Sequence, residues 1–589
     1  MPNYTAPLRD HLFCLYEVLD FEAHTRLPAF QSSSRDVIEA VLEQSARFAA
    51  QVLYPLNRSA DEEGVHVANG QVRTPTGFKQ AYAQLVEGGW PALTASPEHG
   101  GQGLSHMVNF LFEEMMNGAC LSFGLFPGLT RGAYVAIAQH GSEEQKALYA
   151  PKLASGEWAG SMCLTEAHCG TDLGLLKTQA AAKGDGSYAL TGTKIFISAG
   201  EHDLTPNIIY LVLARLPDAP KGSKGISLFL VPKVLVKEDG SLGARNGVSC
   251  GSVEHKMGIH GCPTCVMNFD GATGWLMGEA HQGLKAMFAM MNTERIAVGI
   301  HGLAIAEASY QNAVAYARDR LQGRAPTGPR DPSKPADPII VHPDVRRMLM
   351  QQRALTEGCR MLALWTAQAL DVSEHHPDPA VRKSADDMVA LMTPVVKAFL
   401  TDCGSEVANL GIQVLGGHGF IRANGQEQYV RDVRITQIYE GTNGIQSADL
   451  LGRKILHLGL FDRLADPLRD FLACHADDDA MAEFTAPVSA AFDHLDDATR
   501  LIRERVALNP EEAGAAAVDY MRLFALTAVG YLFARAAQVS LPKADEDFYR
   551  AKLATARFYM QRILPEAASL HAKIVAGAAS LMELDEAMF

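Results

Sequence analysis

One segment of the chain, residues 160–280, carries short β-rich runs, and helical periodicity surrounds it on both sides. Runs such as "SYALTGTKIFISAG" and "GISLFLVPKVLV" are separated by Gly, Pro and Asp turns, which predicts a compact antiparallel β domain. Before and after this segment, apolar residues recur at helical spacing. We therefore predict a multidomain α+β protein, mostly α, whose order is helical, β, helical, helical.

The predicted domains follow these changes of pattern. A chain of 589 residues is too long for one ordinary core and suits about three or four domains. We predict an N-terminal helical domain with an N-terminal extension, a β domain, a helical bundle opened by one very long helix, and an additional helical domain. The respective limits are 1–158 (extension 1–35), 159–281, 282–460 (long helix 283–321) and 461–589.

Composition excludes several classes of protein. The net charge of −15 argues against a broad nucleic-acid surface, and ten cysteines are too few for a disulfide scaffold. The first residues lack a basic region followed by an apolar core, so no signal peptide is expected. The most apolar stretch, 513–541, is interrupted by Asp519 and Arg522, and we interpret it as a buried helix. We expect a cytoplasmic protein with no integral membrane segment.

Familiar catalytic motifs are absent or lack their context. No G-x-G-x-x-G fingerprint and no Walker A motif occur, which disfavours a nicotinamide dehydrogenase of the doubly wound type. "GVSCG" matches the hydrolase pattern at Ser249, but no helical stripe follows it. Cys262 and Cys265 have redox spacing, yet a strand pattern follows where a helix would be needed. No paired Cys/His ligand set appears, and we predict no metal.

Three other stretches carry chemistry in less obvious form. In "ITQIYEGTNGIQ", Glu440 is either a loop acid beside a helix N-cap or a general base aimed at a substrate. In "CLTEAHCGTD", Gly170 and Thr171 can present an N–H and a hydroxyl to a phosphate or a flavin edge, although an ordinary turn has the same composition. "QVLGGHGF" reads as a glycine turn after a helix.

Taken together and in this order, the stretches resemble the acyl-CoA dehydrogenase family. "KIFISAG", "RDVRITQIYEGTNGIQ", "PEHGGQGL" and "GSEEQKALYAPKLASGEW" add to the resemblance, which spans about residues 80–455. The extended ends resemble the larger bacterial subgroup that includes 3-methylmercaptopropionyl-CoA dehydrogenases and long-chain acyl-CoA dehydrogenases. The resemblance implies FAD held between a helical domain, a β domain and a helical bundle, and this family binds FAD without a Rossmann motif.

The reaction implied by the resemblance is α,β-desaturation of an acyl-CoA thioester to a trans-2-enoyl-CoA. Glu440 matches the base that removes the α-proton while the β-hydrogen leaves as hydride to flavin N5. The resemblance assigns one hydrogen bond on the thioester oxygen to the backbone N–H of the base and another to the FAD ribityl chain. Such bonds stabilise the charge that develops on the oxygen. Desolvation beside Tyr439 is expected to raise the pKa of the carboxylate toward neutrality.

The resemblance also implies the binding residues. Those matching FAD contacts are Met162, Leu164, Thr165, Gly170, Thr171, Phe196, Ser198, Arg320, Gln322, Gln413, Gly416, Gly417, Thr442 and Gly444. Those matching substrate contacts are Thr171, Asn292, Arg295 and Gly441. In relatives, the position of Arg320 reaches FAD phosphate across a subunit boundary.

The chain also departs from the family pattern. Ala167, His168 and Cys169 stand where relatives usually have Pro-Gly-Ala, so the path of this loop is open. Phe196 replaces a common Trp, Ser198 a Thr and Gly444 a Gln. Gly452 stands where many relatives place an arginine for CoA, so no arginine is assigned there.

The resemblance implies two protein partners: electron-transfer flavoprotein as electron acceptor and a second copy of the chain in a homodimer. Two alternatives remain at this stage. An acyl-CoA oxidase would pass its electrons to oxygen instead. A non-catalytic flavoprotein of the same fold would bind DNA through its last domain, which needs a basic face, whereas acidic residues outnumber basic ones in 461–589.

Overall fold

A computed structural model describes residues 4–68 and 71–589, which fall into two compact units. Unit 1 comprises Met1–Ala46, His106–Gly118 and Val298–Phe589, and unit 2 comprises Arg47–Ser105 and Ala119–Ala297. The α+β, mostly α fold class is confirmed, including the helical segment at the C-terminal end of the chain. The limits of the four predicted domains stay a prediction.

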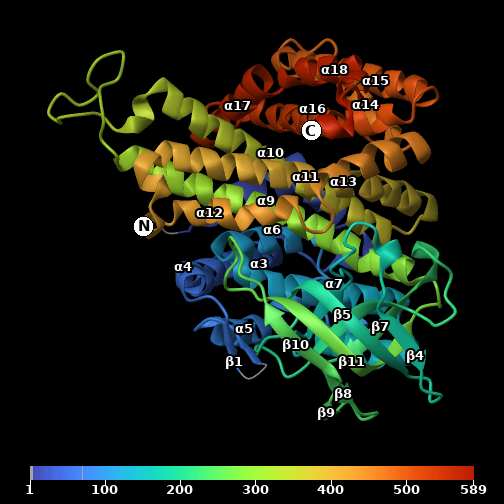
Figure 1. The fold of residues 1–589 in the computed structure, drawn as a ribbon. Coiled ribbons are helices and arrows are strands. Elements are labelled where there is room, and N and C mark those ends of the chain that lie inside the picture. Colours follow the sequence, from blue (N-terminus) through green and yellow to red (C-terminus); the bar gives the residue numbers. More distant parts are fainter. Residues whose placement is uncertain (1–3, 69–70) are drawn as a thin grey trace. The chain divides into compact units, whose positions relative to one another are not determined.

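A seven-stranded sheet forms the centre of unit 2 (Figure 1). Its path runs β10-β11-β5-β4-β6-β3, and β7 pairs with both β11 and β6. The strands of this sheet are β3 Ala159–Cys163, β4 Gln179–Ala182, β5 Tyr188–Ser198, β6 Ile208–Arg215, β7 Ile226–Pro232, β10 Val248–Val253 and β11 Thr264–Met277. The predicted β domain therefore exists, and Ser249 lies within a strand, where no nucleophile turn can form.

The sheet is not wholly antiparallel, which corrects one detail of the prediction. β3 runs parallel to β6 over five residue pairs, and β4 meets β6 in a single parallel pair. Local alternation of residues identifies strands, but it does not say which strand becomes the neighbour of which. β6 and β7 are buried along almost their whole length, because they are near-continuous apolar runs.

Helices and two small sheets complete unit 2. Ser142 caps the helix that begins at Glu143: its side chain accepts from the Gln145 backbone N–H and the Gln145 side chain accepts from the Ser142 backbone N–H. The helices are α4 Tyr54–Glu63, α5 Phe78–Glu87, α7 Leu121–His140 and α8 Glu143–Ala154, and the small sheets pair β1 His66–Ala68 with β2 Gln71–Arg73 and β8 Val234–Val236 with β9 Leu242–Arg245.

Long helices form unit 1 (Figure 1). The predicted long helix is confirmed as α9, Gly283–Asp319, whose first part belongs to unit 2 and whose remainder belongs to unit 1. α10 and α11 pack against each other along the unit. The helices of unit 1 that precede residue 460 are α1 Leu8–Leu12, α2 Phe21–His24, α3 Arg35–Phe48 (whose last two residues lie in unit 2), α6 His106–Ala119, α10 Pro343–His375, α11 Pro379–Leu415, α12 Gln426–Val433 and α13 Asn443–Ala448.

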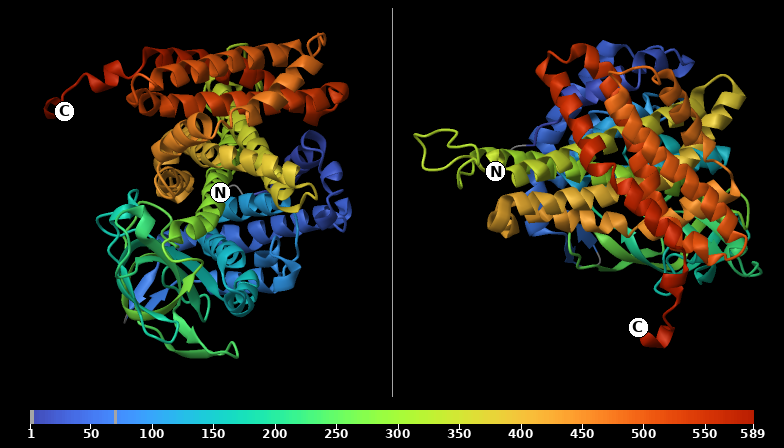
Figure 2. Two further views of the ribbon diagram at one scale, coloured as in Figure 1. Left: turned by 90° about the vertical axis from the view of Figure 1, so that its right-hand side faces the viewer. Right: turned by 90° about the horizontal axis from the view of Figure 1, so that it is seen from above.

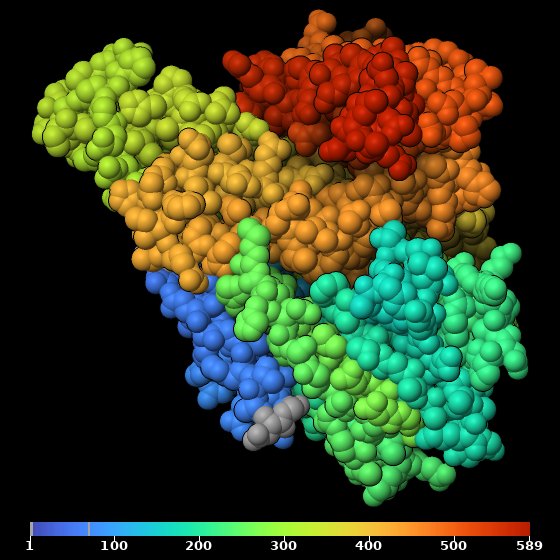
Figure 3. All heavy atoms as spheres, in the orientation of Figure 1, coloured from blue at the N-terminus to red at the C-terminus, as the bar shows by residue number. Residues whose placement is uncertain are grey.

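The C-terminal part of unit 1 is a bundle in which α16 packs against α15, α17 and α18 (Figure 2). Its atoms form one contiguous block in the space-filling view, orange-red to red (Figure 3). Of the described residues, only Glu511–Lys543 is long and apolar enough by composition to pass as a membrane span, and 83% of its most apolar window is buried. That burial is what the core helix of a bundle requires. The helices are α14 Asp462–Cys474, α15 Ala482–Val506, α16 Glu511–Ser540, α17 Asp547–Phe558, α18 Glu566–Ala576 and α19 Ala579–Met582.

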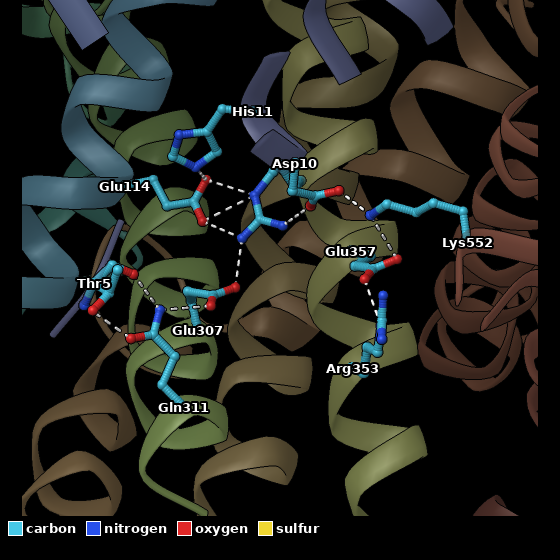
Figure 4. A network of polar contacts seen from close by, with 10 residues as sticks. Thr5, Asp10, His11, Glu114, Glu307, Gln311, Arg353, Glu357 and Lys552 are labelled. Carbon is cyan, nitrogen blue, oxygen red and sulfur yellow. Dashed lines mark hydrogen bonds and ion pairs between the residues drawn. The ribbon is translucent and has the colours of Figure 1, made fainter. Parts of the chain in front are cut away.

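A buried charged cluster joins distant parts of unit 1 (Figure 4). The guanidinium of Arg360 on α10 is 1% exposed and contacts Asp10 of α1, Glu114 of α6 and Glu307 of α9. The Lys552 ammonium of α17 contacts Asp10 as well. Burial opposes the charged form of Glu114, but Arg360 and His11 together outweigh it and lower the pKa of this carboxyl to about 2. The cluster therefore holds ionised partners inside the unit.

Candidate active site

The Glu440 segment lies in unit 1, immediately before α13. Thr442 is the N-cap of this helix, since its side chain accepts from the backbone N–H of Ile445. Glu440 is therefore not the capping residue, which removes the simplest structural explanation for this acid. Its side chain is half-buried.

The backbone of this segment adopts a conformation that is rare outside glycine. Glu440 has φ +58° and Gly441 has φ +83°. The positive φ at residue 441 favours glycine, and a Cβ there would come within 2.8 Å of Nε2 of Gln446 and displace that side chain. A left-handed glutamate costs free energy and is found where the surroundings impose it, often at functional sites.

Tyr439, the residue before Glu440, contacts helix α9 through its hydroxyl. The hydroxyl of Tyr439 lies 3.2 Å from Nδ1 of His301, which is buried on α9. This contact orients an aromatic ring directly before the carboxylate.

In unit 2, the residues predicted to contact flavin lie on β3, β5 and the loop after β3. Met162, Leu164 and Thr165 are half-buried, as is Ser198 at the end of β5. The loop is bonded to β5, because the N–H of Ile195 donates to the Thr165 carbonyl over 2.9 Å. The structure thus brings these predicted residues together within the unit.

Phe196 is the most unusual residue of this group. Its φ is +59° and its side chain is 60% exposed, although it belongs to a strand of a packed sheet. An exposed aromatic ring in a strained backbone is suited to stack on a flat ligand ring.

Sequence reasoning missed the ion pair that supports this loop. The Lys194 ammonium on β5 is fully buried and donates to the Glu166 carboxylate and to the Leu164 carbonyl, both over 2.9 Å. Thr178 and the backbone N–H of Lys177 donate to Glu166 as well. Burial alone would raise the pKa of Glu166, but Lys194 and these donors lower it to about 2. A lysine inside the apolar run "TGTKIFIS" was the available signal.

Residues 167–169, where the sequence departs from the acyl-CoA dehydrogenase pattern, follow Glu166 directly and place His168 and Cys169 beside the Glu166–Lys194 ion pair. Ligand atoms of Glu166, His168 and Cys169 lie within 4.8 Å of one another, a grouping that metal sites also show. The carboxylate is already engaged by Lys194, and His168 bonds the Leu175 carbonyl over 3.0 Å. These contacts favour a role in fixing the conformation of the loop over a role in binding a metal. Gly170 and Thr171, next along the loop, are exposed.

A second exposed group of predicted cofactor residues lies in unit 1 around the turn after α11. Gln413, Gly416 and Gly417 are exposed there, and the Tyr316 hydroxyl on α9 bonds Nδ1 of His418 over 3.0 Å. This bond draws the turn to the C-terminal end of α9, where Arg320 is exposed. The side chain of Gln322, two residues on, is exposed too.

Gly417 in this turn is not explained by packing within the chain. Its φ is not positive, and an added Cβ would meet no atom within 4 Å. A glycine that neither conformation nor internal packing requires is suited to close approach of a bound molecule.

The predicted CoA-side residues on α9 lie in unit 2. Arg295 is half-buried and its Nη1 donates to Oδ1 of Asn292 over 3.4 Å. Arg453, beside the unassigned Gly452, forms a 3.7 Å pair with Asp449 in unit 1. Gly444, on α13, is exposed. The predicted residues therefore fall into two sets, one in each unit.

Four family models match the chain in sequence order. They describe the acyl-CoA dehydrogenase N-terminal domain at 36–157, its middle domain at 161–272, its C-terminal domain at 281–456, and an acetyl-CoA dehydrogenase C-terminal-like domain at 464–585. The chain is 43% identical to the 3-methylmercaptopropionyl-CoA dehydrogenase of Ruegeria pomeroyi over 98% of this chain and 99% of the relative. The chain belongs to the acyl-CoA dehydrogenase family. The resemblance stated from the motifs is confirmed, including the domain beyond the usual family core.

Two solved structures share the fold of this family member. Caenorhabditis elegans ACDH-11 in complex with C11-CoA matches with a TM-score of 0.76 and 19% identity, covering 95% of this chain and 91% of that one. An acyl-CoA dehydrogenase from Bacillus anthracis complexed with FAD matches with a TM-score of 0.75 and 20% identity, covering 92% and 88%. By its family models and its 43% identical relative, the protein is an acyl-CoA dehydrogenase family enzyme.

Proposed function

We propose that the protein desaturates the α,β carbon–carbon bond of an acyl-CoA thioester with FAD as cofactor and Glu440 as the base. The observation that carries this proposal is the left-handed, half-buried Glu440, which is not the cap of the helix it precedes. This conformation costs about 1–3 kcal/mol, and unlike the left-handed Asp20, which caps α2, Glu440 caps no helix in return.

Glu440 would take the α-proton onto its carboxylate. A thioester α-proton is far too weakly acidic for a free carboxylate, so the base must be desolvated and the developing oxygen charge must be stabilised. Half-burial next to Tyr439 supports the first condition. The backbone N–H of Glu440 is the proposed donor for the second, and Gly441 leaves room for the ligand to approach.

The residues present fit FAD. In unit 2, exposed Phe196 offers a ring face, and Ser198 and Thr165 offer hydroxyls; in unit 1, exposed Gly417 carries no side chain that could stand in the way of a ligand. FAD, when bound, supplies the hydride acceptor that a carboxylate cannot. The Bacillus anthracis relative complexed with FAD supports the same assignment.

The substrate class is supported by the relatives. Ruegeria pomeroyi 3-methylmercaptopropionyl-CoA dehydrogenase is named for a short sulfur-containing acyl group, whereas the worm protein was solved with C11-CoA. We propose an acyl-CoA substrate, electron-transfer flavoprotein as acceptor and a cytoplasmic homodimer. Absorbance bleaching during anaerobic titration with methylthio-propanoyl, medium-chain, long-chain and aryl-substituted acyl-CoA would identify the acyl group. Oxygen uptake during turnover would instead indicate an oxidase.

The decisive test of the base is Glu440→Gln. The variant keeps the shape of the side chain and removes its proton-accepting charge, so we expect bound FAD at the wild-type level. Turnover should fall at least about 10²- to 10⁴-fold, the usual contribution of a general base. Glu483→Gln, on the exposed pair with Arg557, serves as control and should retain activity. A Glu440→Gln protein that turns over acyl-CoA normally would refute the assignment.

A further inference from the structure

The strained Glu440–Gly441 pair is held by two side chains, Gln446 and Lys397, to which the sequence analysis gave no role. Both carbonyls of the pair accept hydrogen bonds from side chains. Nε2 of Gln446 donates to the Glu440 carbonyl over 2.9 Å, and Nζ of Lys397 donates to the Gly441 carbonyl over 2.8 Å. Two adjacent left-handed residues are therefore fixed at both of their acceptors.

Lys397 is an unusual residue for its position. It lies on α11 inside the apolar run "TPVVKAFL" and its side chain is 0% exposed. Burying a charged ammonium costs several kcal/mol unless hydrogen bonds compensate it. Two of its acceptors lie in the Glu440 segment: the Gly441 carbonyl and Oδ1 of Asn443, each at 2.8 Å. The buried charge is thus directed at this segment.

Asn443 continues the connection back to α11. Its Nδ2 donates to Oδ1 of Asp402 over 2.7 Å and to the Thr401 hydroxyl over 3.0 Å. The same Asp402 oxygen accepts from Nε2 of Gln437 over 2.6 Å. The amide of Asn443 therefore lies between the Lys397 ammonium and the Asp402 carboxylate. These bonds tie Gln437, Gly441 and Asn443 to one stretch of α11, residues 397–402.

We infer that Lys397 is a positioning residue for Glu440: its bond to the Gly441 carbonyl holds the base in the left-handed geometry that deprotonation requires. This inference rests on the proposed role of Glu440. Lys397 does not itself meet the substrate. It acts through the backbone, so its loss should impair proton removal more than ligand binding.

The test compares Lys397→Met, which keeps the length of the side chain and removes its donors, with Lys397→Arg, which keeps a donor and the charge. The readouts are FAD per chain, kcat and KM, and exchange of the substrate α-hydrogen into deuterated water. Exchange reports proton removal separately from hydride transfer. We expect Lys397→Met to bind FAD with KM within about threefold of wild type, while kcat and α-exchange fall together by about 10- to 100-fold, as misplacement of a reacting group predicts. Lys397→Arg should recover part of both rates.

Lys552→Met is the matched control, because it also removes a buried lysine that contacts acids in unit 1. It should lower thermal stability while leaving α-exchange per bound flavin unchanged. If Lys397→Met does not fold, Gln446→Leu takes its place, since it removes the bond to the Glu440 carbonyl and should show the same signature.

The outcomes separate this inference from the proposed function. An active wild type with Lys397→Met, or in its place Gln446→Leu, exchanging α-hydrogen at the wild-type rate overturns the positioning role alone. A loss confined to KM or to FAD content overturns it too. A wild type that binds FAD yet neither exchanges α-hydrogen nor turns over any acyl-CoA overturns the proposed function and this inference with it.

Discussion

At the scale of single residues, two buried lysines donate hydrogen bonds to the backbone of the candidate site. Lys194 in unit 2 and Lys397 in unit 1 are each fully buried, and each donates to a main-chain carbonyl of a segment predicted to meet a ligand. A lysine used in this way must be compensated by hydrogen bonds, since an unpaired buried ammonium is too costly. Both are positioned by tertiary contacts that sequence spacing does not reveal.

The Glu166–Lys194 pair predicts a pH dependence. The pKa of Glu166 is lowered to about 2 from an ordinary 4.5, so its contribution to stability is complete above about pH 4.5 and is lost as the pH falls toward 2. Burial also lowers the pKa of Lys194, so the charged form of this lysine is less favourable in the folded protein than in the unfolded chain. The Glu166 carboxylate accepts from Lys177 and Thr178 as well as from Lys194, and these bonds stabilise its ionised form.

Lys194→Met should therefore destabilise the protein at pH 7 by on the order of 2 kcal/mol and flatten this acid limb of the stability profile. The loop carrying Leu164 and Thr165 would loosen, so bound FAD should be lost more readily. Urea unfolding from pH 3 to 7 and flavin fluorescence in the filtrate after ultrafiltration measure the two effects. Lys183→Met, at an exposed lysine that bonds Thr273 in the same unit, is the control. Unchanged FAD retention in Lys194→Met would contradict the expectation.

At the scale of elements, the charged cluster around Arg360 links the stability of four helices of unit 1. Acids from α1, α6 and α9 meet one guanidinium on α10. Breaking a buried ion pair by removing one partner costs about 3–5 kcal/mol, because the other charge is left uncompensated. The cluster thus couples short helix α1 to three long helices.

Arg360→Met should lower the urea midpoint of unit 1 by an amount equivalent to about 3–5 kcal/mol, measured by circular dichroism. Arg557→Met breaks only a half-exposed pair with Glu483 and should cost less than about 1 kcal/mol. Equal shifts in the two variants would show that the Arg360 cluster adds nothing beyond a surface pair. Limited proteolysis near α1 should increase only in Arg360→Met.

The elements themselves were largely predictable, because periodicity is a local property of the sequence. The long α9, the glycine turn after α11 and the β segment follow from the pattern of residues along the chain. The parallel pairing of β3 with β6 did not follow, since a strand pattern does not name its neighbour. The left-handed Glu440 did not follow either, because "IYEGT" specifies an acid before glycine and leaves the φ of that acid open.

At the scale of the whole molecule, charge and exposed apolar residues bear on the partners. A net charge of −15 disfavours a DNA-binding role. Next to the Gly416–Gly417 turn, Phe420 is 81% exposed and Ile421 is 52% exposed. Adjacent exposed apolar side chains of this size commonly mark an interface. The resemblance places Arg320 at a subunit boundary, and we expect a second copy of the chain to cover this region.

Phe420→Asp should therefore weaken a homodimer and reduce bound FAD at the same time, because a buried charge in the interface is unfavourable. Light scattering coupled to size-exclusion chromatography measures the first effect and flavin absorbance per chain the second. Leu508→Asp, at a residue that is 89% exposed in another part of unit 1, should change neither. A monomeric wild type, or a Phe420→Asp dimer with full FAD, would contradict this prediction.

The contacts of Asp10 have a consequence for biosynthesis. Its cationic partners include Arg360 and Lys552. Lys552 lies 542 positions after Asp10 in the sequence, so one contact of α1 forms only after that lysine has been synthesised. At about 5–20 residues per second, a ribosome needs roughly half a minute to two minutes to reach that lysine. During this interval α1 cannot settle into its final environment, and the nascent N-terminus must remain soluble or guarded until translation is almost finished.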